Sequence, residues 1–244
     1  MRTTRIYVDL ELTAGKEVLL PGAQSMHLLR VLRLRTGAVL TLFNGRGGEY
    51  GAELTGADKA GARLRVGAHA AVERESPLQL TLLQGVARGE RMDFIIQKAT
   101  ELGVQRIVPL SCEFSVVRLE PSALQRRVAH WRTVAIAACE QCGRNRLPEI
   151  ESIFELEPAC SGGEAGAKLM LVPQAPAALA ALARAMKSAV LLVGPEGGLS
   201  GREQLLAQRH GFEACRLGPR ILRTETAPLA ALAALQALAG DLAS

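Results

Sequence analysis

Residues 189–203 have the sequence AVLLVGPEGGLSGRE, and this stretch decides the fold. The first five residues form an apolar run typical of a buried strand, and residues 194–198 break it with three glycines and a proline. Ser200 and Glu203 have the spacing of a capping box, which predicts that a helix begins there. A strand, a glycine-rich turn and a helix leave backbone N–H groups open to a ligand. We therefore expect a small-molecule site at this turn.

A second polar turn follows the predicted helix. Residues 215–227 have the sequence CRLGPRILRTETA, in which a Gly-Pro pair is surrounded by Arg, Thr and Glu. Turns that follow consecutive strands are expected to lie side by side in an α/β sheet, at the edge where such folds bind ligands. The two turns together predict one site but do not name its ligand.

The composition favours a protein of the cytoplasm with an anionic partner. The net charge is +5, and only 3% of residues are aromatic, which argues against stacking of nucleic-acid bases as the main mode of binding. The cysteines are odd in number and follow no secretory segment, which favours a reduced compartment. No apolar run approaches the ~20 residues that cross a bilayer, so we expect no membrane contact.

No residue pattern predicts a metal site or a common nucleotide site. Cys139 and Cys142 form a CxxC without a second Cys or His pair, and the four histidines are scattered, so we expect no metal. The chain has no G-x-x-x-x-G-K-[ST], no early G-x-G-x-x-G and no G-x-S-x-G. These absences exclude a P-loop NTPase and disfavour a Rossmann site, the ordinary methyltransferase fold and an α/β-hydrolase.

Two regions of different organisation are predicted. Residues 1–72 combine short apolar runs with turns, among them the hairpin signal Asn44-Gly45, which suggests a small β-barrel. After a charged linker at 73–77, apolar runs alternate with helical patterns, which predicts a parallel sheet covered by helices on both faces. The predicted strands are 78–86, 105–110, 167–172 and 189–193, and the predicted helices are 90–102, 121–142, 177–185, 200 onward and 226–238.

Residues 24–34 have the apolar spacing of a helix, with Arg30, Arg33 and Arg35 interleaved. These arginines are either a contact for a phosphate backbone or an ordinary solvated helix face, and the residues alone leave both open.

Four separate motifs resemble the RsmE family of ribosomal RNA small-subunit methyltransferases, which methylate N3 of a uridine in 16S rRNA. They are GPEGGLS at 194–200, LGPRILRTETA at 217–227, IQKATELG at 96–103 and ACEQCGRNR at 138–146. Residues 27–33 and 43–45 are similar to the N-terminal domain of the family. Phe114, in Glu113-Phe114-Ser115, stands where the family often has an arginine.

The resemblance implies an α/β protein with two domains. Residues 1–72 are then a PUA-like β-barrel that binds RNA, and residues 73–244 are a SPOUT methyltransferase domain with a trefoil knot. It also implies S-adenosylmethionine as cofactor, 16S rRNA within the 30S subunit as partner, and a homodimer. Two alternatives stay open, namely a non-catalytic ribosome-associated RNA-binding protein and a SPOUT methyltransferase that acts on another RNA.

By the same resemblance, three loops at strand ends hold the cofactor, at 171–174, 194–198 and 217–226. The candidate cofactor-binding residues are Leu171, Gly194, Glu196, Gly197, Gly198, Leu217, Gly218, Ile221, Leu222, Arg223, Thr224 and Thr226. Arg223, Glu225 and Arg144 are candidate catalytic residues. The candidate RNA-binding residues are Arg30, Arg33, Arg35, Arg144 and Arg146. Glu196 is either an acceptor for a ribose hydroxyl or an exposed loop carboxylate.

Overall fold

The computed structural model describes residues 4–115, 121–162, 166–183 and 186–242. The chain divides into two compact units. Unit 1 consists of Met1–Glu75 and Cys139–Leu147, and unit 2 consists of Ser76–Ala138 and Pro148–Ser244. The sequence pattern did not indicate that Cys139–Leu147, far along the chain, packs with the N-terminal residues.

Unit 1 is built on a five-stranded sheet in the order β1-β3-β4-β5-β2. β1 is parallel to β3, and all other neighbours are antiparallel. β3 and β4 form the hairpin that Asn44-Gly45 predicts. Alternating residues of β3, β4 and β5 bury one apolar face as the core of this unit. The strands are β1 (Arg5–Tyr7), β2 (Glu17–Leu19), β3 (Val39–Phe43), β4 (Glu49–Asp58) and β5 (Gly61–Ala70).

The helix predicted over 24–34 differs from the observed one. α1 (Gly22–Met26) starts after Pro21 and continues as a π-helix, η1 (His27–Val31), whose wider turn is closed by the N–H of Leu32 on the carbonyl of His27. Arg33 then has φ 53°, a left-handed conformation that ends the helix. The prediction was wrong in its last residues because the apolar spacing does not reveal where the turn widens.

Unit 2 contains an eight-stranded sheet in the order β11-β13-β10-β12-β6-β7-β8, with β9 paired to β7. Every neighbouring pair is parallel, which confirms the predicted parallel sheet. The strands are β6 (Gln79–Gly85), β7 (Arg106–Ser111), β8 (Glu149–Ile150), β9 (Phe154–Glu155), β10 (Ala167–Leu171), β11 (Ala177–Ala178), β12 (Ser188–Val193) and β13 (Glu213–Arg216).

The register of this sheet forms continuous apolar rows on both faces. One row joins Leu169, Leu191, Leu82, Ile107 and Ile150, and all five belong to one buried cluster. Residues next to them in the chain point to the opposite face, and five of these belong to a second cluster, namely Leu83, Val108, Met170, Val190 and Leu192. A sheet that is apolar on both faces needs helices packed on each face, as the sequence predicted.

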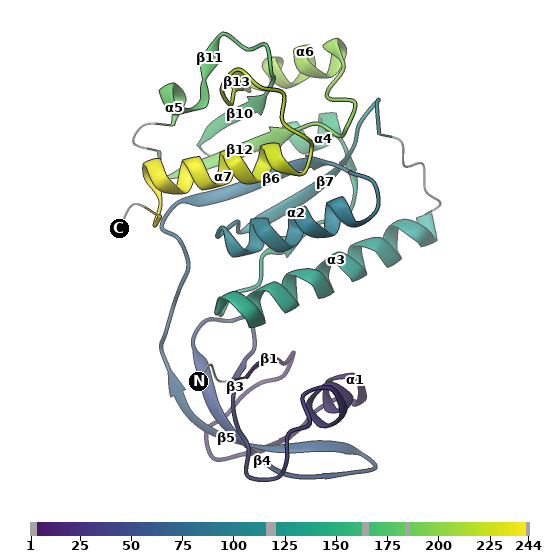
Figure 1. Cartoon of the computed structure of the whole chain (residues 1–244), viewed down its shortest axis with the longest axis vertical. Coiled ribbons are helices and arrows are strands. Elements are labelled where there is room, and N and C mark those ends of the chain that lie inside the picture. Colours follow the sequence, from purple (N-terminus) through teal and green to yellow (C-terminus); the bar gives the residue numbers. More distant parts are fainter. Residues whose placement is uncertain (1–3, 116–120, 163–165, 184–185, 243–244) are drawn as a thin grey trace. The chain divides into compact units, whose positions relative to one another are not determined.

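Helices supply both covers. α2 (Glu90–Glu101), α3 (Pro121–Cys142), α5 (Leu179–Leu182) and α7 (Thr226–Ala239) pack on the first cluster, and α4 (Leu156–Cys160) and α6 (Gly201–Arg209) on the second. Figure 1 shows α2 and α7 crossing in front of the strands. α5 is shorter than the helix predicted at 177–185, because residues 177–178 form β11 instead. Residues 184–185 lie outside the described residues. None of the helices in the described part of the chain has the length and apolarity of a membrane span.

The capping box predicted for α6 is present and has a second use. The Ser200 hydroxyl accepts from the Glu203 N–H, and the Glu203 carboxylate accepts from the Ser200 N–H at 2.8 Å. The other carboxylate oxygen of Glu203 accepts from the N–H of Glu113 at 2.8 Å. Glu203 is 8% exposed, so it joins the start of α6 to the segment after β7 inside the protein.

We expect Glu203→Ala to destabilise the protein more than Ser200→Ala. The serine variant loses one cap, which costs about 1 kcal/mol. The glutamate variant also leaves the Glu113 N–H without its acceptor, which adds about 1–3 kcal/mol. Urea unfolding of both variants measures the difference, and equal losses would contradict the second use of Glu203.

Candidate functional site

Unit 2 contains a cavity of about 540 Å³ at the carboxyl ends of its strands. Its wall comes from the loop after β10, the glycine-rich loop after β12 and the segment between β13 and α7. Arg91 of α2 and Gln204 of α6 complete it. A volume of this size suits one small molecule.

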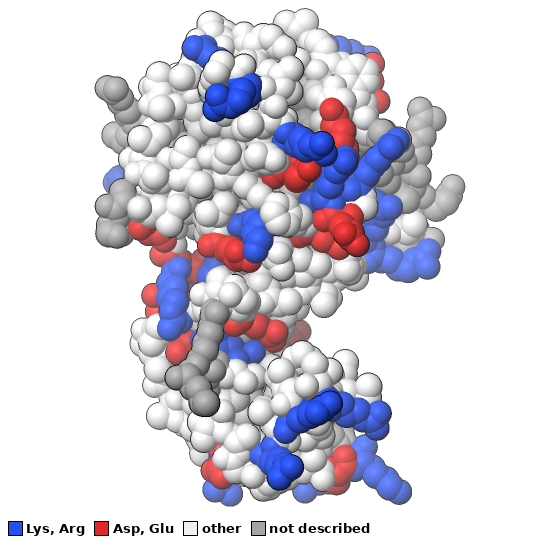
Figure 2. Space-filling model, viewed as in Figure 1, with Lys and Arg blue, Asp and Glu red and all other residues white. Residues whose placement is uncertain are grey.

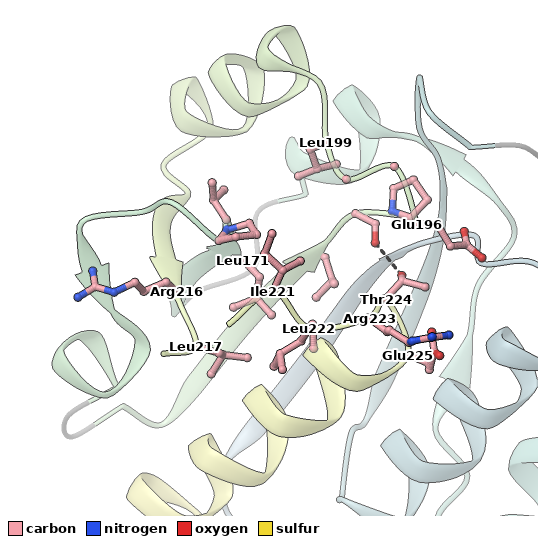
Figure 3. Close-up of a pocket in the computed structure, with 18 of the residues that line it drawn as sticks. Leu171, Glu196, Leu199, Arg216, Leu217, Ile221, Leu222, Arg223, Thr224 and Glu225 are labelled. Carbon is pink, nitrogen blue, oxygen red and sulfur yellow. Dashed lines mark hydrogen bonds between the residues drawn. The ribbon is translucent and has the colours of Figure 1, made fainter. Parts of the chain in front are cut away.

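The two turns do not meet in the way the sequence predicted. β12 and β13 are not neighbours, because β10 lies between them. The segment after β13 instead passes the end of β10, and the Thr224 hydroxyl donates to the Gly194 carbonyl at 3.0 Å, as drawn in Figure 3. Gln84 of β6 donates to the same hydroxyl at 3.4 Å. A buried side-chain network, and not strand adjacency, therefore brings the two turns together.

The glycine-rich loop has no room for side chains at its tightest points. A Cβ on Gly194 would lie 2.7 Å from the carbonyl carbon of Gly198. A Cβ on Gly85, at the end of β6, would lie 2.5 Å from the Pro195 nitrogen. These neighbours are backbone or ring atoms, which cannot move aside. Glycine is thus required here by close packing of backbone segments.

Apolar and charged side chains occupy different parts of the cavity wall. In Figure 3, Leu171, Ile221 and Leu222 lie together, and Glu196 and Glu225 lie away from them. Ile221 is 78% exposed although it is a large apolar residue, so it offers free apolar surface. The arrangement suits a ligand with one apolar and one polar part.

Glu196 is a fixed anion in this wall. Its Oε1 accepts from the Arg88 N–H at 2.9 Å and from Arg91 Nη1 at 2.9 Å. Burial alone would raise the pKa of Glu196, but the hydrogen bonds from Arg88 and Arg91 and the Arg91 charge outweigh it and lower the pKa below its usual value. Glu196 is therefore ionised at neutral pH, and it stands in the cavity wall as an acceptor.

Fewer contacts hold the Glu225 carboxylate than hold that of Glu196. Its Oε2 is buried without a hydrogen-bond partner and lies 3.8 Å from Arg91 Nε. Arg223, two residues earlier, is exposed, and no partner of its side chain is found in the described part of the chain. The Arg223 guanidinium is therefore open to a ligand, whereas the Glu225 oxygen is buried and has no hydrogen bond within the described residues.

Most of the predicted cofactor-binding residues line this one cavity. Gly218, in the segment between β13 and α7, and Thr226, the first residue of α7, do not. The sequence missed Arg91 and Gln84, because each lies in a regular helix or strand without a motif of its own. The predicted residues in the wall are Leu171, Gly194, Glu196, Gly197, Gly198, Leu217, Ile221, Leu222, Arg223, Thr224 and Glu225.

Phe114, where the RsmE resemblance breaks, packs against the glycine-rich loop. A Cβ on Gly197 would lie 2.7 Å from the Phe114 Cβ. The aromatic ring is 47% exposed. Phe114 thus supports the outer side of the loop and leaves part of its ring in solvent.

The predicted RNA-binding arginines belong to unit 1, and they differ in exposure. Arg30, Arg33 and Arg35 are exposed along η1 and the residues after it, a part of unit 1 where Figure 2 shows basic side chains gathered. Arg144 is 4% exposed and binds both carboxylate oxygens of Glu75 through Nε and Nη2. Arg146 is exposed and pairs with Glu73 at 2.8 Å.

The residues on either side of Arg144 also form hydrogen bonds within unit 1. Asn145 is fully buried; its side chain accepts from Arg5 at 2.6 Å and donates to the Val72 carbonyl at 2.7 Å. Arg74 donates to the Gly143 carbonyl at 2.9 Å. The loop that ends α3 is thus bound to β1 and to the residues after β5. A catalytic or RNA-binding role of Arg144 stays a prediction, and it requires release of Glu75.

Comparison with known proteins agrees with the fold and the cavity. Residues 74–236 match the family model of an RNA methyltransferase domain, and residues 20–67 match that of an RNA methyltransferase PUA domain. The chain is thus a member of a class of RNA methyltransferases that carry a PUA domain.

Within that class, the chain belongs to the ribosomal RNA small subunit methyltransferase E family. It is 34% identical to the protein of that name from Buchnera aphidicola subsp. Schizaphis graminum, over 99% of this chain and 98% of that protein. A crystal structure of the same-named protein from Neisseria gonorrhoeae, bound to S-adenosyl methionine, is 39% identical with a TM-score of 0.91 and covers 98% of this chain and 99% of its own. A methyltransferase from Legionella pneumophila in complex with SAM is 38% identical with a TM-score of 0.94, over 99% and 100% of the two chains.

We expect Arg144→Met to destabilise the protein by about 3–5 kcal/mol, because it leaves the Glu75 carboxylate unpaired in a mostly buried place. Arg146→Met is the matched control, since its ion pair is exposed and contributes less than about 1 kcal/mol. Replacing Glu75 and Arg144 together should recover much of the loss. Urea unfolding measures all three variants. Equal, small losses for Arg144→Met and Arg146→Met would contradict a structural role for Arg144.

Proposed function

We propose that this protein transfers the methyl group of S-adenosylmethionine to N3 of a uridine in 16S rRNA of the small ribosomal subunit. The observation that carries the proposal is a cavity whose wall is built from three loops at the strand ends. Membership of the family supports the choice of substrate, and the relatives bound to S-adenosylmethionine support the choice of cofactor.

The residues of the cavity fit this cofactor. Leu171, Ile221 and Leu222 offer apolar surface to the adenine, and the closely packed glycine-rich loop offers bare backbone groups to the nucleoside. The Glu196 carboxylate, which lines the cavity, accepts from a ribose hydroxyl. When bound, S-adenosylmethionine supplies an electrophilic methyl group on a sulfonium.

The protein must then deal with the uridine proton. N3 of uridine is protonated at neutral pH, so the site has to remove this proton or stabilise the anion that develops. Glu225, whose side chain lines the cavity, is the residue we propose to accept the proton. Arg223, whose guanidinium is free, orients the base. Arg144 takes part only if RNA displaces Glu75 from it.

We further propose the finer architecture that the family resemblance implies. Residues 1–72 form a PUA-like barrel, and residues 73–244 form a SPOUT domain with a trefoil knot. The bond of Thr224 to Gly194 supports the knot, because the segment after β13 must pass β10 before α7 begins. An enzyme of this kind acts in the cytoplasm as a homodimer, and a monomer in sedimentation equilibrium would contradict the dimer.

Two other functions remain as competitors. A non-catalytic RNA-binding protein does not need a cavity whose glycines and carboxylates are all in place, and we therefore rank it lower. A methyltransferase for another RNA uses the same cofactor site, so only the substrate distinguishes it.

We expect labelled methyl groups from S-adenosylmethionine to enter 30S subunits that lack their native uridine methylation. Nucleoside analysis should find N3-methyluridine at one 16S position, and Arg223→Ala should lower the rate. Cofactor binding without incorporation would contradict the substrate, and no stabilisation by S-adenosylmethionine in a thermal shift would favour the non-catalytic protein.

We also expect Arg30, Arg33 and Arg35 to bind the phosphate backbone of the substrate. No Asp or Glu occurs from residue 18 to 48, so nothing in that stretch neutralises them. Replacing all three with Gln should reduce the salt dependence of 30S binding, with a log–log slope smaller by about two to three. Lys59→Gln with Arg65→Gln is the matched control on exposed positions of unit 1. A slope as steep as in the wild type would contradict the contact.

A further inference from the structure

Arg91 lies outside the three loops and yet contacts two of them. It is the second residue of α2, and its side chain lines the cavity. Its Nη1 donates to Glu196 in the loop after β12 at 2.9 Å, and its Nε lies 3.8 Å from Glu225 in the segment before α7. One guanidinium thus lies between two carboxylates that belong to different parts of the cavity wall.

The two contacts differ in strength. Glu196 has a second donor, the Arg88 N–H, from the residue before the N-cap of α2. Among the described residues, the cation found beside Glu225 is Arg91, in the longer ion pair, and Glu225 Oε2 has no hydrogen bond. Removing Arg91 would therefore loosen Glu196 partly and would leave Glu225 without a cation of its own.

Arg91 also offsets the electrostatic repulsion between Glu196 and Glu225. Two carboxylates that share a cavity repel each other, and a guanidinium between them replaces this repulsion with two attractions. The Arg91 side chain is 41% exposed, which means that solvent weakens each attraction without removing it. Figure 2 shows basic and acidic side chains interleaved over this part of unit 2.

We infer that Arg91 is a positioning residue for the reaction, which holds Glu196 for the cofactor and Glu225 for the uridine. The planar guanidinium is suited to this task because it has donors on several sides. The inference rests on the proposed function for its effect on methyl transfer, but its effect on cofactor binding is independent of the RNA.

Isothermal titration with S-adenosylmethionine tests the first half. Arg91→Met should weaken binding about tenfold, because Glu196 loses one of its two fixed donors, and Arg91→Lys should recover part of the loss. Arg202→Met is the matched control, since Arg202 is also the second residue of its helix and is exposed away from the cavity. An unchanged affinity in a folded Arg91→Met protein, with a wild-type thermal midpoint, would overturn the inference.

Methyl transfer to 30S subunits tests the second half. Arg91→Met should lower kcat about tenfold at saturating cofactor and RNA. If Arg91 acts through Glu225, the double variant Arg91→Met with Glu225→Gln should be no slower than Glu225→Gln alone. Independent, multiplied losses would overturn this role. A wild-type protein that binds cofactor but methylates no RNA contradicts the proposed substrate and leaves the titration result to decide on Arg91.

Discussion

The cavity depends on one buried hydroxyl, that of Thr224. It donates to the Gly194 carbonyl and accepts from the Gln84 amide, so it joins the segment after β13 to the glycine-rich loop and to β6. Neither β12, which precedes the glycine-rich loop, nor β6 is a neighbour of β13 in the sheet. The hydrogen bonds of Thr224 therefore connect segments that main-chain pairing does not connect. A buried hydrogen bond contributes only about 1 kcal/mol net. Its importance here lies in geometry, because it fixes where Arg223 and Glu225 stand beside the cavity.

Elements with a strong local pattern were predictable from the sequence. Periodicity predicted α2 and α3 within a residue of their observed bounds, and the apolar run at 189–193 predicted β12. The spacing of Ser200 and Glu203 predicted the capping box. Strand order was not predictable, because a sheet apolar on both faces places no constraint on which strands are neighbours. The loops that line the cavity were thus predicted, but the adjacency of strands inferred for two of them was wrong.

The arginines show a second limit of the sequence. Arg144 and Arg146 stand two residues apart in one basic loop, yet one is buried against Glu75 and the other pairs with Glu73 at the surface. The sequence gives the charge of each arginine but not the carboxylate that pairs with it, which lies some 70 residues away along the chain. For that reason a basic cluster predicts RNA binding best where acidic residues are absent, as around Arg30, and least where carboxylates from elsewhere in the fold are available.

The two carboxylates of the cavity have unequal surroundings, and the inequality suits different tasks. Glu196 accepts two hydrogen bonds on one oxygen, and these hold its pKa low, so it is a permanent acceptor that a neutral hydroxyl can bind. Glu225 has a distant cation and an oxygen that is buried and unbonded. Among the described residues, this oxygen of Glu225 lacks a hydrogen bond, whereas Glu196 accepts two. Arg91 contacts both carboxylates, so one guanidinium joins two acids of the cavity wall that have different surroundings.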